Sequence, residues 1–364
     1  MIKFLNSIYS ADPKKFLNGT VSDFWDILNP RKNDGELYEY SLCNRLSNLI
    51  SQYEQGNHLN NAASGCKKTQ KRHIKYLKRL EYNNYKKLKE LITSDSQYLP
   101  IRIRETFNLL EPDDISQLIN GRWQATKLGK LLLSEVFCYD TFRTSTKCVE
   151  FYKKTHIGRM HCLYCGIYDL KTISIVKPTE ENEFKDENGK MLFDLDHFYL
   201  KSQYPFLALS FFNLVPCCGI CNSRIRGTKE FDHTTHINPY EDSFDTHYKF
   251  EFNEIEIVAA TVIGTAHIKS LDIVRHPNST RTTDKTAADF QLIARYREYT
   301  SDLDLFLENI INNRDRSLSE IEATLYKQSE KLPKNRNEIP YYSKGKFYLD
   351  FWDKVKPNLL KRAP

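Results

Sequence analysis

Cys162-Leu-Tyr-Cys165 and Cys218-Gly-Ile-Cys221 are two cysteine pairs that bracket the stretch Phe193-Asp-Leu-Asp-His-Phe198. Two pairs of the form C-x2-C are a specific zinc pattern, because tetrahedral Zn²⁺ takes four soft thiolates presented as two knuckles. The 52 residues between the pairs are more than a simple zinc ribbon requires. The sequence therefore predicts a structural zinc site with a further element, which carries an Asp-His dipeptide, inserted between its knuckles.

Cys217 stands beside Cys218 and is a competing ligand. Only Cys218 gives the two-residue spacing to Cys221, so it is the favoured one of the two. His161, next to Cys162, is a conceivable substitute ligand that the fourth cysteine makes unnecessary. The alternative interpretation of the whole pattern is a set of isolated buried thiols.

Size and composition indicate a soluble globular protein. The chain has 364 residues, 40% of them hydrophobic and 27% charged, which is enough for two or three domains. No secretory signal opens the sequence, and its most apolar stretch, 204–221, is interrupted by polar residues and proline, so no membrane span is expected. We therefore expect a cytoplasmic protein whose nine cysteines are reduced thiols and not a disulfide framework.

Positive charge is concentrated in one segment. The net charge of the chain is +6, whereas residues 67–90 alone contain ten basic and two acidic residues. A polyanion would be steered toward this segment, and its tyrosines Tyr76, Tyr82 and Tyr85 could stack on bases. The alternative is a solvated helix face, which is what lysine runs most often mark.

The chain divides into three regions by pattern. Residues 1–150 are expected to be mainly helical, and 151–240 to consist of short strands and turns around the zinc knuckles. Residues 241–364 are expected to begin with a hairpin over 248–263, where apolar residues alternate, and to continue as helices from about residue 285. The expected fold class is α+β.

Three further stretches carry a family resemblance. Leu195-Asp-His-Phe198, Asn213-Leu-Val-Pro216 and Cys218-Gly-Ile-Cys-Asn222 follow one another as in the HNH endonuclease motif, in the version with a four-cysteine structural zinc. Lys201-Ser-Gln-Tyr-Pro205 and Ile237-Asn-Pro-Tyr240 add to the match, which covers about a fifth of the chain. The resemblance implies a ββα-metal, treble-clef-like core between helical N- and C-terminal regions that recognise substrate or partners.

More weakly, the layout is similar to HNH nucleases of bacterial anti-phage systems, including Septu-type and retron-linked modules in which the nuclease works with an ATPase. The sequence contains no Gly-rich phosphate-binding loop with a following lysine, so ATP dependence would come from such a partner.

The resemblance also implies roles for individual residues. His197 would be the general base that takes a proton from the attacking water, and Asp196 with Asn222 would hold one Mg²⁺ or Mn²⁺. Asn213 would tie the loop and orient the strand that carries His197. Asp194 lies two residues before Asp196, on the same strand face, and is either an assisting metal ligand or a solvated strand residue.

The chemistry of these side chains agrees with the implied roles. An imidazole titrates near pH 7 and suits general base catalysis. Carboxylate and amide oxygens are hard ligands suited to magnesium, whereas the thiolates keep zinc at a separate place. Lys201, Arg224 and Arg226 either contact the phosphate backbone of a substrate or are solubilising surface residues.

The expected function is metal-dependent hydrolysis of phosphodiester bonds by an endonuclease of antiviral defence. DNA is favoured as the substrate, and structured RNA such as tRNA is the alternative, because a site that grips one phosphodiester reads no bases. The competing class is a zinc-stabilised module that binds nucleic acid or protein without catalysis. The complete set Asp196, His197 and Asn222 distinguishes the enzyme, since a binding module does not require a base and two hard ligands.

Overall fold

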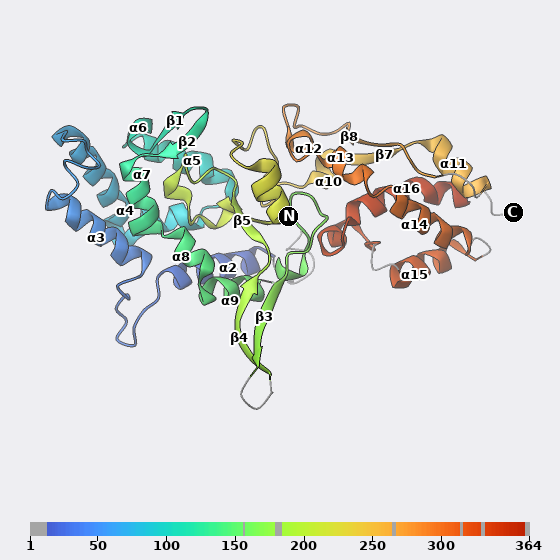
Figure 1. The fold of residues 1–364 in the computed structure, drawn as a ribbon, viewed down its shortest axis with the longest axis horizontal. Helices are drawn as coiled ribbons and strands as arrows, with labels where there is room; N and C mark the ends of the chain where they lie inside the picture. The colour runs from blue at the N-terminus through green and yellow to red at the C-terminus, as the bar shows by residue number, and fades with distance from the viewer. Residues whose placement is uncertain are drawn as a thin grey trace.

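The computed structural model describes residues 13–155, 157–178, 184–263, 267–313, 316–328 and 332–360. Figure 1 shows the helices of the N-terminal half at one end and α14, α15 and α16 at the other, with β5 between them. All four sheets of the described residues are antiparallel and two-stranded, and helices make up most of the remaining regular structure. The fold class is therefore α+β, as predicted.

The N-terminal region is mainly helical, as the sequence predicted, and contains one hairpin that the pattern analysis missed. Its core is formed by apolar side chains at helical spacing, including Leu46, Leu77 and Leu80, which are all buried. The elements are α2 (Pro13–Leu28), α3 (Leu42–Glu54), α4 (Lys67–Thr93), η1 (Ser96–Tyr98), α5 (Leu99–Phe107), α6 (Pro112–Ile115), β1 (Ser116–Ile119), β2 (Arg122–Ala125), α7 (Lys127–Leu131), the π-helix η2 (Leu132–Phe137), α8 (Tyr139–Thr144) and α9 (Thr146–Lys154).

Helix α4 carries the basic segment, and part of its charge is already compensated. Lys78 pairs with Glu54, and Lys87 contacts both Glu90 and Glu105. The helix is interrupted at residues 82–85, where the backbone leaves helical geometry. The positive field of this segment is therefore weaker than its sequence suggests.

A buried carboxylate joins α4 to α6. Asp114 accepts hydrogen bonds from Arg72 at 2.6 and 2.7 Å, and His73 Nε2 lies 3.2 Å from its Oδ1. Burial would raise the pKa of this carboxyl, but the His73 and Arg72 side chains outweigh burial and hold the pKa well below its usual range. Asp114 thus ties α6, which directly precedes the β1–β2 hairpin, to α4.

We expect Asp114→Asn to lower the free energy of unfolding by about 2–3 kcal/mol, because it breaks a buried ion pair and leaves the Arg72 charge uncompensated. A carboxyl whose pKa is depressed in the folded state stabilises the fold above its unfolded pKa of about 3.9, and this contribution is lost as the pH falls below that value. Urea denaturation at pH 7 and pH 3.5 measures both effects. The exposed neighbour Asp113 provides the control, Asp113→Asn, which should change stability little; equal effects of the two variants would contradict the assignment.

The middle region contains two antiparallel sheets and short helical turns. Figure 1 shows the ribbon of β3 and β4 projecting from the body, whereas β5 lies inside it. The elements are η3 (Ile157–Arg159), β3 (Thr172–Pro178), β4 (Phe184–Met191), β5 (Asp194–His197), η4 (Pro205–Leu207), η5 (Phe211–Asn213), β6 (Leu214–Cys217) and the π-helix η6 (Ile220–Arg226).

In the C-terminal region, the prediction of a hairpin over 248–263 is wrong in its second half. Residues 248–252 do form a strand, β7, but its antiparallel partner is β8, and a helix stands between the two. Ile255 and Ile257 alternate as in a strand, but the apolar run that follows also satisfies a helix, and short apolar runs do not separate the two. The elements are α10 (Phe244–His247), β7 (Tyr248–Phe252), α11 (Glu254–Ile263), β8 (Leu271–Arg275), α12 (Thr286–Asp289), α13 (Leu292–Arg297), α14 (Ser301–Ile311), α15 (Leu318–Gln328), η7 (Arg336–Tyr341) and α16 (Gly345–Leu360).

Among the helices in the described ranges, none combines the length and the apolar character that crossing a bilayer requires.

Candidate functional site

The four cysteines of the two C-x2-C pairs converge. The sulfur atoms of Cys162, Cys165, Cys218 and Cys221 all lie within 4.8 Å of one another, and all four residues are buried. Sulfurs around one tetrahedral Zn²⁺, with bonds of about 2.3 Å, are about 3.8 Å apart. The Sγ atoms of Cys165 and Cys218 are 4.0 Å apart, so the donor set fits a zinc ion in both type and spacing.

Backbone amides support the thiolates. The backbone N–H of Cys218 donates to Cys162 Sγ at 3.3 Å, and that of Cys221 donates to Cys218 Sγ at 3.4 Å. Hydrogen bonds of this kind stabilise negative charge on sulfur and fix the ligand rotamers. The cluster is thus built for thiolate ligation.

Cys217 is outside the cluster. It is fully buried at the end of β6, and burial raises the pKa of its thiol well above the usual value. Of the two neighbouring cysteines, Cys218 is therefore the one placed to bind metal, as the spacing predicted. His161 also lies outside the cluster, because its Nε2 contacts Asp169 at 2.7 Å.

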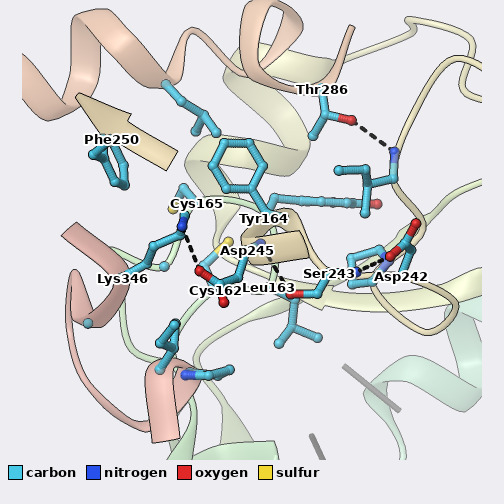
Figure 2. A pocket seen from close by; sticks show the side chains of 18 of the residues that line it. Cys162, Leu163, Tyr164, Cys165, Asp242, Ser243, Asp245, Phe250, Thr286 and Lys346 are labelled. Carbon is cyan, nitrogen blue, oxygen red and sulfur yellow. Dashed lines mark hydrogen bonds and ion pairs between the residues drawn. The ribbon is translucent and has the colours of Figure 1, made fainter. Parts of the chain in front are cut away.

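Side chains of the C-terminal region contact both knuckles. In α13, Arg295 donates to Cys221 Sγ at 3.3 Å, and the Tyr296 hydroxyl donates to the carbonyl oxygen of Cys165 at 2.6 Å. A cavity of about 120 Å³ lies next to this contact. Cys162, Cys165 and Phe250 are among its lining residues (Figure 2). Residues far apart in the sequence thus enclose the two knuckles.

Strands β5 and β6 place the remaining candidate residues. Their register pairs Asp194 with Cys217, Asp196 with Val215 and His197 with Leu214. Because side chains alternate along a strand, Asp194 and Asp196 share one face, whereas His197 faces the other side. The face with the two aspartates contacts η6, which begins within the second knuckle.

His197 is buried and its ring is fixed. Its Nε2 lies 3.0 Å from the backbone carbonyl oxygen of Ala208, and the Tyr139 ring packs edge-on against it with centroids 4.4 Å apart. A carbonyl only accepts hydrogen bonds, so Nε2 carries the proton and Nδ1 keeps the lone pair. Burial lowers the pKa of His197 to about 3, so the imidazole is neutral at pH 7 but a weaker base than the unperturbed ring expected from the sequence.

Asn213 closes the loop between β5 and β6. Its side-chain oxygen accepts a bond from the backbone N–H of Tyr199 at 2.7 Å, and its amide nitrogen donates to the carbonyls of Tyr199 and Leu207 at 3.0 and 3.2 Å. Asn213 is fully buried, so these bonds satisfy most of its hydrogen-bonding capacity. The side chain ties the segment that follows His197 to the one that supplies the Ala208 carbonyl.

Asp196 is part of a buried ion pair. Its Oδ1 accepts from Arg226, and its Oδ2 accepts from the Tyr164 hydroxyl at 2.7 Å. The side chains of Asp196 and Arg226 are each only 2% exposed. Burial raises the pKa of Asp196, against the lowering effects of Arg226 and Tyr164. Both carboxylate oxygens are therefore engaged by protein groups.

The prediction that Arg226 is a surface residue for substrate contact is wrong. It lies at the end of the π-helix η6, and its second guanidinium nitrogen donates to the Phe198 carbonyl at 2.9 Å. Arg224, two residues earlier, is exposed, as is Gly227, at which the helix ends with a φ of 54°. The wide π-helical turn gives the arginines on this short helix different environments, so Arg224 is the one available to solvent.

We expect Arg226→Ala to destabilise the protein by about 3–5 kcal/mol, because it leaves the Asp196 carboxylate buried without its cation. Arg224→Ala removes the same charge from an exposed position on the same helix and should change stability by about 0.5 kcal/mol or less. Urea denaturation of both variants measures the difference. Similar stability of the two variants would show that the Asp196 pair contributes nothing to the fold.

Asn222 pairs with Asp194 and not with Asp196. Its amide nitrogen donates to Asp194 Oδ2 at 3.1 Å, and both residues are partly exposed. The predicted hard-ligand pair of Asp196 and Asn222 is therefore not formed in this structure. Both carboxylate oxygens of Asp196 instead accept hydrogen bonds, one from Arg226 and one from Tyr164. Asp194 and Asn222 have oxygen donors of the type that Mg²⁺ and Mn²⁺ prefer. The alternation of Asp194 with Asp196 was the sequence signal for this pairing.

Lys201 lies on the opposite side of the strand, near His197. Its Nζ contacts Asp140 at 3.0 Å and lies 4.7 Å from the centre of the Tyr139 ring. The side chain is 38% exposed, so an incoming anion would compete with Asp140 for this ammonium group.

Comparison with known proteins gives one partial match. The chain is 31% identical over 96 residues to the Septu protein PtuB of Bacillus thuringiensis, a match that covers 25% of this chain and 36% of the relative. The similarity thus spans about a third of that protein's length. No protein-family model and no solved structure matches the chain significantly.

Proposed function

We propose that this chain is a metal-dependent HNH endonuclease that hydrolyses phosphodiester bonds, with DNA as the favoured substrate. The observation that carries the proposal is His197, held on β5 as a neutral imidazole with its Nε2 proton directed to a backbone carbonyl. Strand β5 pairs with β6, which leads into the second zinc knuckle and then to Asn222 beside Asp194. This order of strand, strand, knuckle and helix supports assigning the region to the ββα-metal class.

In the proposed reaction, Nδ1 of His197 takes a proton from water as the water oxygen bonds to phosphorus. The bond from phosphorus to the leaving sugar oxygen breaks, and that oxygen takes its proton from solvent. Asn213 keeps the loop and the Ala208 carbonyl in place, so the Nε2 proton stays fixed while Nδ1 acts. Arg226 and Tyr164 hold Asp196 in the strand and thereby orient the adjacent His197.

Asp194 and Asn222 would hold the divalent cation through their carboxylate and amide oxygens. When bound, Mg²⁺ or Mn²⁺ would neutralise the negative charge that develops on the phosphate and the leaving oxygen. Asp196 does not fit this role while Arg226 is bound to it. The four thiolates would hold Zn²⁺ as a structural ion.

We propose bacterial anti-phage defence as the setting, supported by the partial similarity to a Septu protein. In that setting the nuclease would work with a partner protein, and an ATPase is the kind that the sequence resemblance suggests. The exposed N- and C-terminal helical regions offer the surface for such a complex.

A second candidate is a zinc-stabilised binding module without catalysis. The observation that favours it is the closure of the site: both oxygens of Asp196 are engaged, and His197 is buried beneath Tyr139 on the other face of β5. A binding module would hold nucleic acid or protein and leave it intact.

Cleavage assays separate the two candidates. The purified protein would be incubated with plasmid DNA, phage DNA and total RNA, with Mg²⁺, with Mn²⁺ or with no added divalent ion. We expect cleavage only with a divalent ion, on DNA in preference to RNA, by protein that retains its zinc. Zinc-loaded protein that binds nucleic acid but cuts neither substrate, alone or with cell extract added, would contradict the nuclease.

A further inference from the structure

The hairpin of β1 and β2 is an exposed ribbon in the N-terminal region (Figure 1). Its turn residues Asn120 and Gly121 both have positive φ, 51° and 71°, which is the type I′ geometry of a tight hairpin. Leu118 and Ile119 are 57% and 42% exposed, although both are large apolar residues. Because Leu118 and Ile119 are consecutive, each face of the ribbon ends in an exposed apolar side chain.

The two faces of the ribbon differ in chemistry. Directly opposed residues share a face, so Leu118 and Trp123 lie on one side. The other side carries the pair Gln117–Gln124 and the pair Ile119–Arg122, and all four of these residues are exposed. Glutamine and arginine are the side chains that read purine edges with paired hydrogen bonds.

The first face attaches the ribbon to the core that carries the candidate site. Trp123 Nε1 donates to Glu230 Oε1 at 2.7 Å, and Glu230 follows η6 closely in the sequence. Helix α7, directly after the ribbon, packs against η4, because a Cβ at Gly129 would lie 3.2 Å from Pro205 Cγ. The ribbon is therefore held beside the helix that carries Asn222, with its second face left open.

The charge of the ribbon suits a polyanion. Arg122, Lys127 and Lys130 are all exposed, and the sequence has no acidic residue from 115 to 134. Within the described part of the chain, none of these three cations pairs with a carboxylate, unlike Lys78 and Lys87 of α4. The ribbon and helix α7 thus offer positive charge that no carboxylate of the described residues pairs with.

We propose that the outward face of the β1–β2 ribbon, formed by Gln117, Ile119, Arg122 and Gln124, enters the major groove of duplex DNA and holds it against the candidate site. The major groove of B-form DNA admits a two-stranded β-ribbon and presents purine acceptors and donors to such side chains. The proposal rests on the proposed nuclease function, and it identifies duplex DNA as the substrate class.

Duplex RNA serves as the discriminating ligand. The major groove of A-form RNA is deep and narrow and does not admit a ribbon. Contacts of Arg122 and the two glutamines with base edges are therefore available on duplex DNA only. Contacts with phosphate alone would instead be shared by both duplexes.

Binding is measured in a His197→Gln background without divalent ions, by fluorescence anisotropy with 30-base-pair DNA and RNA duplexes. We expect Arg122→Ala, and separately the double change Gln117→Ala with Gln124→Ala, to weaken DNA binding about 10-fold or more while RNA binding changes little. Lys269→Ala is the matched control, because it removes one exposed charge in the C-terminal region and should change DNA binding less than about 2-fold. Zinc content and melting temperature confirm that each variant is folded.

The inference is overturned if the parent does not bind duplex DNA, if the ribbon variants bind it as the control does, or if both duplexes are affected equally. DNA binding unaffected by the ribbon variants would show that this face does not contact DNA. Cleavage by the parent with ribbon-independent binding would leave the nuclease standing and refute the ribbon. Ribbon-dependent DNA binding without any cleavage would support the ribbon as a DNA contact and refute the nuclease.

Discussion

Cys218→Ser should abolish zinc binding and unfold the core between the knuckles. A serine hydroxyl is a poor ligand for Zn²⁺. The substitution therefore removes one of the four buried thiolates that would hold the ion. A structural zinc site contributes on the order of 10 kcal/mol to folding in small zinc domains, which is more than most single substitutions remove. Metal analysis of the purified protein should fall from about one zinc per chain to none, with a large loss of thermal stability.

Cys217→Ser is the matched control for this experiment, because it changes the same atom one residue earlier. Cys217 is buried but lies outside the cluster, so the variant should keep its zinc and lose only the modest stability associated with a buried hydroxyl. Zinc loss from the Cys217 variant together with zinc retention by the Cys218 variant would reverse the ligand assignment. Zinc retention by both would refute the site.

The zinc ligands could be predicted from the sequence because their spacing alone carries the information. A C-x2-C pair forms a knuckle by local geometry, and only Cys218 has that spacing to Cys221. The mainly helical N-terminal region could also be predicted from the sequence, because the buried leucines of α3 and α4 recur at helical spacing.

The arrangement around Asp196 could not be predicted, because it depends on contacts between distant segments. Tyr164 comes from the first knuckle and Arg226 from the helix after the second, and both meet Asp196 only in the folded protein. The π-helical turn of η6, which sets where Arg226 points, has no sequence signature at this length. The pairing of Asn222 with Asp194 follows from the same turn.

The β1–β2 hairpin is a different case, since its signal was present. Asn120-Gly121 is the strongest short-range hairpin signal, and it lies between segments that pair in register. The prediction of a mainly helical region over 1–150 passed over this signal, because only the four-residue α6 precedes the hairpin. At 248–263 the sequence signal was instead over-interpreted. The alternation of apolar residues predicted a second strand over a stretch that forms the apolar helix α11.

His197→Gln should reduce cleavage about 10²–10⁴-fold, the range that general base catalysis contributes. The glutamine amide can still donate to the Ala208 carbonyl, so the loop contact is preserved, but no basic nitrogen remains at the position of Nδ1. The rate is measured on plasmid DNA with Mg²⁺ or Mn²⁺ at saturating metal. His197→Ala should lose the same activity and also some stability, because it leaves a buried carbonyl without its donor.

The control is His267→Ala, a change at a histidine that is 69% exposed in the C-terminal region and contacts Asp304. It should leave the cleavage rate within about 2-fold of the parent, since surface substitutions away from a site have small effects. A zinc-loaded His197→Gln protein that cuts DNA at the parent's rate would remove His197 as the general base from the proposed mechanism. If activity is lost in both His197 variants while zinc and DNA binding persist, the loss belongs to the chemical step. The His197 imidazole, which the Ala208 carbonyl holds in place, would then be the group that accepts the proton.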